Sequence, residues 1–146
     1  VETASHLPGA PNELSLYALE NYWHGKGSAL RRYTLRLDGF VSASANWKGG
    51  SLLTKPVTFE GDSLELNFST SAAGSIRVEI RDIEGNALPG FSLEDCPIYF
   101  GDSVAKTIVW NNQTDLSVHA GQPVQIFFEL KDADLYAFQF RWSDIL

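Results

Sequence analysis

Residues 63–69 read SLELNFS and residues 75–83 read SIRVEIRDI. Apolar residues take every second position in both stretches: Leu64, Leu66 and Phe68 in the first, and Ile76, Val78 and Ile80 in the second. Successive side chains of a strand point to opposite faces, so this alternation is typical of strands that cover a core with one face. The two stretches therefore predict two core strands, the second ending at the turn-forming residues 84–86.

Further strands are predicted on either side of this pair. They are residues 14–19, residues 32–44 with a turn at Asp38-Gly39, an edge strand in 51–59 limited by Pro56, and residues 103–110, 123–130 and 135–142. Residues 87–102 are predicted to form a loop, and residues 131–134 a hairpin connection between the last two strands. No window shows sustained helical periodicity. About eight strands joined by Gly- and Asp-bearing turns predict an all-β fold, an antiparallel, jelly-roll-like β-sandwich.

The composition is that of one globular domain. The chain has 146 residues, of which 44% are hydrophobic and 20% charged. Residues 1–12 contain two prolines and few apolar side chains, which predicts a linker ahead of a sandwich domain over 13–146. The net charge of −7 argues against nucleic-acid and anionic-membrane partners, because binding phosphate requires a positive surface. No apolar run approaches the roughly 20 residues of a membrane span.

Sequence motifs for catalysis are missing. His6, His24 and His119 lie far apart and Cys96 is the single cysteine, so neither a zinc spacing nor an internal disulfide is present. The carboxylates that precede Cys96 should raise the pKa of its thiol. No GxSxG elbow or Gly-rich phosphate loop occurs. A glycosidase needs two carboxylates that flank one sugar bond. Among 18 acidic residues some such pair is unavoidable, so its presence does not indicate a glycosidase. We therefore expect no catalytic residues and no cofactor.

Calcium is the metal that a β-sandwich with these turns could bind. Asp132 and Asp134 with loop carbonyls, or Asp82 with Glu84, could supply some of the oxygen ligands that it needs. Solvated acids in turns account for the same residues without a metal. A structural calcium site therefore stays an open alternative.

Aromatic residues in polar loops indicate a binding function. Trp47 lies in ANWKGG (45–50), where no apolar neighbour would hold an indole in a core. An exposed ring offers apolar area to the C–H face of a sugar, while polar side chains nearby bond the sugar hydroxyls. The expected ligand-binding residues are Trp47, Asn46, Lys48, Tyr99, Asp95, Asp102 and Trp23. Tyr99, Asp95 and Asp102 would form a second wall if loop 87–102 folds toward loop 43–50.

Other aromatic residues are expected to cover the hydrophobic edges of the sandwich. This group consists of Trp110, Trp142, Phe127 and Phe138. They belong to the predicted strands 103–110, 123–130 and 135–142, so packing explains them without a ligand. The same packing remains an alternative for Trp47 and Trp23.

Five stretches together show a family resemblance. They are LRRYTLRLDGFVS (30–42), LLTKPVTFEG (52–61), AAGSIRVEI (72–80), PGFSLEDC (89–96) and FFELKDADLYAFQF (127–140). These stretches resemble the C-terminal β-sandwich region of bacterial proteins, of planctomycete or marine type, in which it follows a five-bladed propeller similar to glycosyl hydrolase families 32 and 43. The resemblance implies an accessory domain of a secreted, periplasmic or cell-surface carbohydrate-active enzyme. In such proteins residues 14–36 would lie at the junction with the propeller.

Two functions follow as expectations. The first is a non-catalytic carbohydrate-binding module that holds a glycan-degrading enzyme on its polysaccharide, with Trp47 stacking on a sugar ring. The alternative is a structural module that packs on the catalytic propeller, with an exposed apolar patch centred on residues 14–36 and no affinity for glycans. A self-sufficient hydrolase ranks last, since it would need paired carboxylates in a cleft.

Overall fold

The computed structural model describes residues 1–22 and 27–143. The chain divides into two compact units, Val1–Phe40 (unit 1) and Val41–Leu146 (unit 2). The division therefore lies after residue 40, whereas the sequence places the end of a linker at residue 12. Residues 1–12 contribute a short strand to unit 1.

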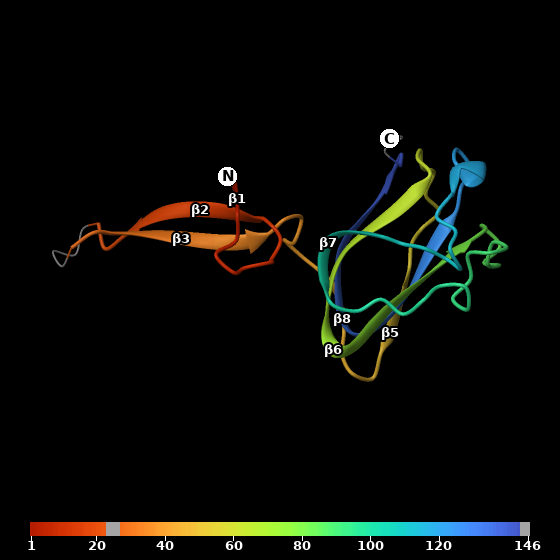
Figure 1. The fold of residues 1–146 in the computed structure, drawn as a ribbon, viewed down its shortest axis with the longest axis horizontal. Helices are drawn as coiled ribbons and strands as arrows, with labels where there is room; N and C mark the ends of the chain where they lie inside the picture. The colour runs from red at the N-terminus through yellow and green to blue at the C-terminus, as the bar shows by residue number, and fades with distance from the viewer. Residues whose placement is uncertain (23–26, 144–146) are drawn as a thin grey trace. The chain divides into compact units, whose positions relative to one another are not determined.

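Unit 1 is a three-stranded antiparallel sheet in the order β1-β2-β3 (Figure 1). Its strands are β1 (Glu2–Thr3), β2 (Glu13–Glu20) and β3 (Ala29–Arg36). β2 and β3 pair over their full lengths, with Leu16 opposite Tyr33. The predicted turn at Asp38-Gly39 follows β3, where the Gly39 N–H donates to Arg36 O at 3.1 Å.

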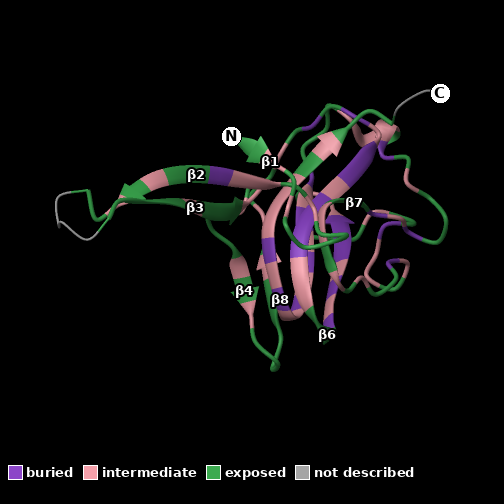
Figure 2. Cartoon of the chain, turned by 60° about the vertical axis from the view of Figure 1, so that its left-hand side comes forward, coloured by how far each residue is buried: buried purple, intermediate pink, exposed green. Residues whose placement is uncertain are grey.

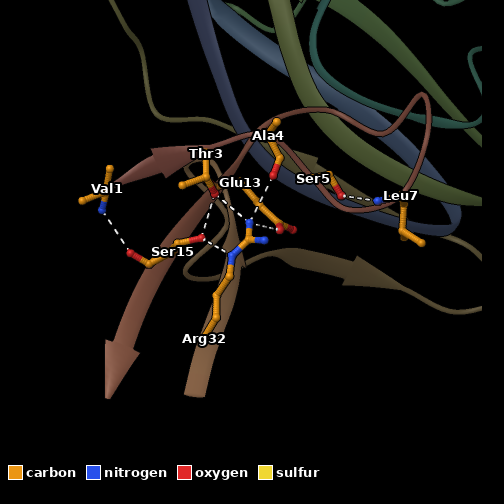
Figure 3. Close-up of polar contacts among 8 residues, drawn as sticks. All are labelled: Val1, Thr3, Ala4, Ser5, Leu7, Glu13, Ser15 and Arg32. Carbon is orange, nitrogen blue, oxygen red and sulfur yellow. Dashed lines mark hydrogen bonds and ion pairs between the residues drawn. The ribbon is translucent and has the colours of Figure 1, made fainter. Parts of the chain in front are cut away.

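Arg32 links the three strands of unit 1 (Figure 3). Its Nε donates to Ser15 Oγ at 2.7 Å, and its Nη2 donates to Thr3 Oγ1 (2.7 Å), Ala4 O (3.1 Å) and Glu13 Oε1 (2.7 Å). Ser15 is the one buried residue in the described part of unit 1. A polar network, and not an apolar core, therefore holds this sheet together.

Unit 2 is one antiparallel sheet in the order β4-β8-β6-β7, with β5 also paired to β8. Its strands are β4 (Ala43–Ala45), β5 (Gly50–Leu53), β6 (Ser63–Arg81), β7 (Asp102–Thr107) and β8 (Gln125–Arg141). A short 3-10 helix, η1 (Ser117–His119), is the only helix in the described ranges. β6 and β8 have 19 and 17 residues and form the long bent pair seen in Figure 1.

β6 and β8 both change direction near their middle. The register between them shifts between Thr70 and Ser75, and Asp132 in β8 has a φ of 45°. Gly74 lies in this bend, where a Cβ would come within 2.4 Å of Asp132 O and 2.8 Å of Lys131 O. Only glycine allows two backbones to approach this closely.

The two halves of the bent sheet share one hydrophobic core. The inward residues on both sides of the bend are buried, and Figure 2 shows them as bands on β6 and β8. They are Leu64, Leu66, Phe68, Ile76, Val78 and Ile80 of β6 and Ile126, Phe128, Leu130 and Leu135 of β8. Phe91, Trp110 and Leu116 from the connecting segments complete the core. The predicted all-β, antiparallel β-sandwich of about eight strands is confirmed.

The predicted hairpin connection at residues 131–134 is wrong. These residues lie inside β8, and β6 likewise runs through both core strands predicted from the alternation. The left-handed Asp132 lies beside the irregular stretch around Gly74 in β6, so the two chains bend together without reversing. Gly and Asp residues are favoured both in bulged bends and in tight turns. The sequence of residues 131–134 therefore suggested a turn.

Candidate functional site

Trp47 lies in a tight turn between β4 and β5. Asn46 Oδ1 accepts the Lys48 N–H at 2.9 Å, and Asn46 O accepts the N–H groups of Gly49 (2.9 Å) and Asp132 (3.0 Å). Gly49 has a φ of 83°, a conformation that favours glycine at the end of such a turn. Asn46 therefore shapes the turn and ties it to the bend of β8, and Trp47 remains 58% exposed at its tip.

Lys131 of β8 covers one side of the Trp47 ring. Its Nζ lies 4.1 Å from the ring centroid, within the range of a cation–π contact. With this lysine in place, Trp47 is still more than half exposed to solvent. The turn and the lysine together hold a flat aromatic platform at the sheet surface.

Charged side chains continue this surface across the strands. Lys131 is opposite Ser75, and Glu129 is opposite Arg77, so all four side chains share one face of the β6–β8 pair. This is the outer face, because the alternate residues of both strands are buried in the core. Arg77 Nη2 and Nε donate to Glu129 Oε1 at 2.7 and 3.1 Å.

An arginine and a phenylalanine extend the same outer face. The guanidinium carbon of Arg81 lies 4.0 Å from the centroid of the Phe127 ring. Arg81 Nε donates to Glu79 Oε1 at 2.6 Å, and Glu79 Oε2 accepts the Leu93 N–H at 2.9 Å. Phe127 therefore packs under Arg81 on the outer face and does not enter the core.

These side chains form one surface, here called the Trp47 face. It consists of Trp47, Lys131, Arg77, Glu129, Phe127 and Arg81. It combines an open aromatic ring with a row of hydrogen-bond donors and one carboxylate, held by neighbouring strands. Such a surface can bind a flat polar ligand by stacking and by hydrogen bonds at the same time.

Tyr99 lies at the opposite edge of the sheet. Tyr99 forms a β-bridge with Ile76 of β6, and Ile76 pairs with Leu130 of β8. Leu130 pairs with Gly50 of β5, which adjoins the Trp47 turn. Three strand-to-strand steps of about 4.8 Å separate the two edges by roughly 14 Å. The structure does not bring Tyr99 and Trp47 together into a common wall.

The Tyr99 hydroxyl is used within the fold. It accepts the Val109 N–H at 2.7 Å and donates to Val109 O at 3.2 Å. Burial raises the pKa of this hydroxyl above its usual value. Both bonds anchor loop 87–102 beside the segment that leaves β7.

The remaining expected binding residues are dispersed. Asp95 accepts from Ser92 Oγ and from Asn111 Nδ2, both at 2.7 Å, so it organises its own loop. Asp102 is exposed at the start of β7. Trp23 lies outside the described residues. Of the predicted set, only Asn46, Trp47 and Lys48 share one place, the β4–β5 turn.

Of the acidic residues considered for calcium, Asp134 and Asp82 accept hydrogen bonds from neighbouring residues, and Asp132 lies at the bend of β8. Asp134 Oδ1 accepts from Ser42 Oγ at 2.8 Å. The Asp82 carboxylate accepts from the Asn86 backbone N–H and side chain, which lowers its pKa. Across residues 1–22 and 27–143, no group of three or more His, Cys, Asp or Glu side chains is placed to hold a metal ion.

Cys96 is buried beside β6. Its Sγ accepts the Val78 N–H at 3.3 Å, and burial raises the pKa of the thiol to about 11. The direction matches the sequence expectation, but the cause is burial, not the preceding carboxylates. The thiol is therefore a structural group at neutral pH.

Four aromatic residues were expected to cover hydrophobic edges of the sandwich. Phe127 packs under Arg81 on the outer face, and the other three differ in position. Trp110 is fully buried and its Nε1 donates to Val78 O at 2.8 Å. Phe138 is half-buried and packs against the core. For Trp142 the expectation is wrong: the residue is 64% exposed just after the end of β8. Trp142 continues the alternation of Phe138 and Phe140, but β8 ends at Arg141, so the sheet does not hold Trp142 against the core.

Sequence reasoning missed the charged part of the Trp47 face. Arg77, Glu129 and Lys131 occupy the positions between the buried residues of β6 and β8. The alternation in the sequence shows that these polar residues point away from the core. It does not show which strands pair or in what register, and the pairing is what brings the three side chains together.

No protein-family model, no curated protein and no solved structure matches this chain. The resemblance to propeller-associated sandwich domains therefore stays an expectation. In the described ranges, no helix has the length and apolar character needed to cross a membrane.

Proposed function

We propose that unit 2 is a non-catalytic carbohydrate-binding module and that the Trp47 face is its binding surface. In this proposal the exposed Trp47 ring stacks on a sugar, and Lys131 or Arg77 donates to its hydroxyls. The module would hold a glycan-degrading enzyme, secreted or at the cell surface, on its polysaccharide.

The observation that supports this proposal most directly is the preorganised indole. Trp47 is held by a hydrogen-bonded turn and contacted by the Lys131 ammonium group, while the residue remains more than half exposed. A ring already fixed in place loses little conformational entropy on binding, which favours stacking on a weakly binding ligand such as a sugar. Arg77 and Glu129 on the neighbouring strands supply the polar partners.

Affinity electrophoresis in gels that contain neutral, uronic-acid or sulfated polysaccharides tests the proposal. We expect one polysaccharide to retard the protein, Trp47→Ala to abolish the retardation and Trp47→Phe to retain part of it. Phe100→Ala is the matched control, because Phe100 is an exposed aromatic residue near the far edge of the sheet. Retardation that survives in Trp47→Ala would contradict the assignment.

Lys131→Met separates the two roles of the lysine. Methionine keeps an apolar stem beside the indole but loses the ammonium charge. If Lys131 only supports the ring, Lys131→Met retains binding to neutral polysaccharides. If its ammonium group also binds the ligand, binding to uronic-acid and sulfated polymers falls most.

A second candidate function rests on unit 1. Leu14 is opposite Leu35 and Leu16 is opposite Tyr33, so these four side chains share one side of the β2–β3 sheet. Leu16, Tyr33 and Leu35 are exposed, as expected of a module that packs on a neighbouring domain through residues 14–36. In this alternative, unit 1 docks on a catalytic propeller and the chain has no affinity for glycans.

The double variant Leu16→Ser/Tyr33→Ser tests this alternative. Titration calorimetry against an isolated propeller domain of the resembled family should show binding by the original chain and its loss in the double variant. Trp47→Ala should leave that binding unchanged. Equal binding by all three proteins would remove the docking role from this apolar side.

A further inference from the structure

A small polar cavity lies on the other half of the bent sheet. Its volume is about 260 Å³, and it is lined by Ser63, Glu65, Thr107, Arg141, Trp142 and Ser143. Ser63 is opposite Arg141, and Glu65 is opposite both Thr107 and Gln139, so the cavity spans β7, β6 and β8. Here it is called the Trp142 pocket.

The wall that contains Trp142 is held in place on both sides. Ser63 Oγ donates to Arg141 O at 3.1 Å before the tryptophan. After it, the backbone N–H and the hydroxyl of Ser143 both donate to Asp62 Oδ1 at 2.7 Å. The exposed indole of Trp142 therefore projects from an anchored stretch of chain.

The carboxylate of Glu65 is oriented within this pocket. Its Oε2 accepts from Gln139 Nε2 at 3.0 Å and from Arg141 Nη1 at 3.4 Å. The Glu65 side chain is 17% exposed, whereas the Arg141 side chain is 58% exposed. Glu65 is thus a positioned acceptor, and Arg141 has donor groups directed to solvent as well as to Glu65.

The pocket retains hydrogen-bonding capacity beyond these contacts. Within the described part of the chain, Glu65 Oε1, the Thr107 hydroxyl and the Trp142 ring make no further hydrogen bond or ring contact. The available groups comprise an acceptor, a hydroxyl, a guanidinium and an indole face. A sugar hydroxyl both donates and accepts, so a neutral sugar can satisfy the carboxylate and the guanidinium together.

We propose that the Trp142 pocket is a second carbohydrate site, which takes a single neutral sugar residue against the Trp142 ring. The cavity is slightly smaller than the roughly 300–1,000 Å³ typical of sites for drug-sized ligands, which suits one sugar ring and not a longer chain. The Glu65 carboxylate accepts two hydroxyls, and Arg141 and Thr107 bond a third.

This site is separate from the Trp47 face. Both halves of β6 bury every second side chain in the same core: Leu64, Leu66 and Phe68 in one half, and Ile76, Val78 and Ile80 in the other. Their outward neighbours, Glu65 in one half and Arg77 in the other, therefore lie on the outer sides of two different halves of the sheet. The second site accordingly does not depend on the proposed function of the Trp47 face.

Two-dimensional ¹H–¹⁵N NMR of the full chain tests the second site. The indole N–H resonance of Trp142 is assigned from its loss in Trp142→Phe, and the protein is titrated with methyl glycosides of glucose, galactose, mannose and xylose. We expect at least one of them to shift this resonance at millimolar concentration. Glu65→Gln should weaken the binding followed at this resonance at least about tenfold, which corresponds to about 1.4 kcal/mol. Trp142→Ala lacks the resonance, so its binding is followed at the backbone N–H of Ser143, another lining residue, and should weaken by at least as much.

Matched controls keep the two sites distinguishable. Trp47→Ala and Phe100→Ala should leave the titration unchanged, since neither residue lines the Trp142 pocket. Near-UV circular dichroism shows whether each variant is folded, and Trp142→Ala decides the result if Glu65→Gln does not fold. No shift with any of the four methyl glycosides, or a shift that disappears in Trp47→Ala, would overturn the proposal.

Discussion

Unit 1 and unit 2 are both antiparallel sheets, but only one of them has a core. Every buried hydrophobic side chain in the described ranges lies between Phe59 and Leu135, in unit 2. In the described part of unit 1 the single buried residue is Ser15, which belongs to the Arg32 hydrogen-bond network. Strand pairing alone gives marginal stability in water, and burial of a hydrophobic face supplies most of the rest. The comparison indicates that unit 2, and not unit 1, supplies the hydrophobic core that stabilises the chain.

The largest expected effect separates the two units directly. Phe128→Ala removes a fully buried ring from unit 2 and should lower the free energy of unfolding by about 3–5 kcal/mol. Leu16→Ala removes a side chain that is 68% exposed in unit 1 and should change it by no more than about 0.5 kcal/mol. Urea denaturation followed by circular dichroism measures both. Similar losses in the two variants would show that unit 1 has a buried apolar face after all.

A smaller effect is expected at the bend that gives unit 2 its core. Gly74→Ala places a Cβ within 2.4 Å of Asp132 O, so the two strands must move apart, at a cost of about 1–3 kcal/mol. Gly50→Ala is the matched control, because its Cβ would meet only Ala45 Cβ at 3.5 Å. Urea denaturation compares the two variants. If Gly74→Ala were as stable as Gly50→Ala, the bend would not require close backbone approach.

The smallest expected effect concerns pH and the core of unit 2. The folded-state pKa of Cys96 is about 11, above the value of about 8.5 for an exposed thiol. The folded state therefore keeps a proton that the unfolded chain releases, so the free energy of unfolding falls as pH rises through this range. The loss should reach about 1 kcal/mol near pH 9. Cys96→Ala should abolish this part of the pH dependence, as measured by denaturation at pH 7 and pH 9.

Prediction from the sequence succeeded where structure follows from local alternation. Leu64, Leu66 and Phe68 are buried on one side of β6, as their spacing predicts. Trp47, which has no apolar neighbours in the chain, is exposed. In each case the neighbours along the chain largely decide whether a side chain turns toward a core or toward solvent.

Prediction failed where the answer depends on residues far apart in the chain. The residues around Asp132 suggest a turn, but the bend forms against Gly74, some sixty positions earlier. Tyr99 and Trp47 were expected to line one binding site, but the strand pairing places β6 and β8 between them. Trp142 was expected to cover a hydrophobic edge of the sandwich, but it follows Arg141, the last paired residue of β8.

The sequence by itself determined the all-β class and the inward face of the core strands, because alternation and turn chemistry are properties of short stretches. Only the tertiary structure decided the bend of β6 and β8, the division after residue 40 and the grouping of side chains on the two outer faces. The register of β6 and β8 joins residues from 44 (Arg81 and Gln125) to 78 (Ser63 and Arg141) positions apart. A shift of one residue would turn every side chain to the other face. That long-range pairing is what places Arg77 beside Glu129 and Glu65 beside Arg141.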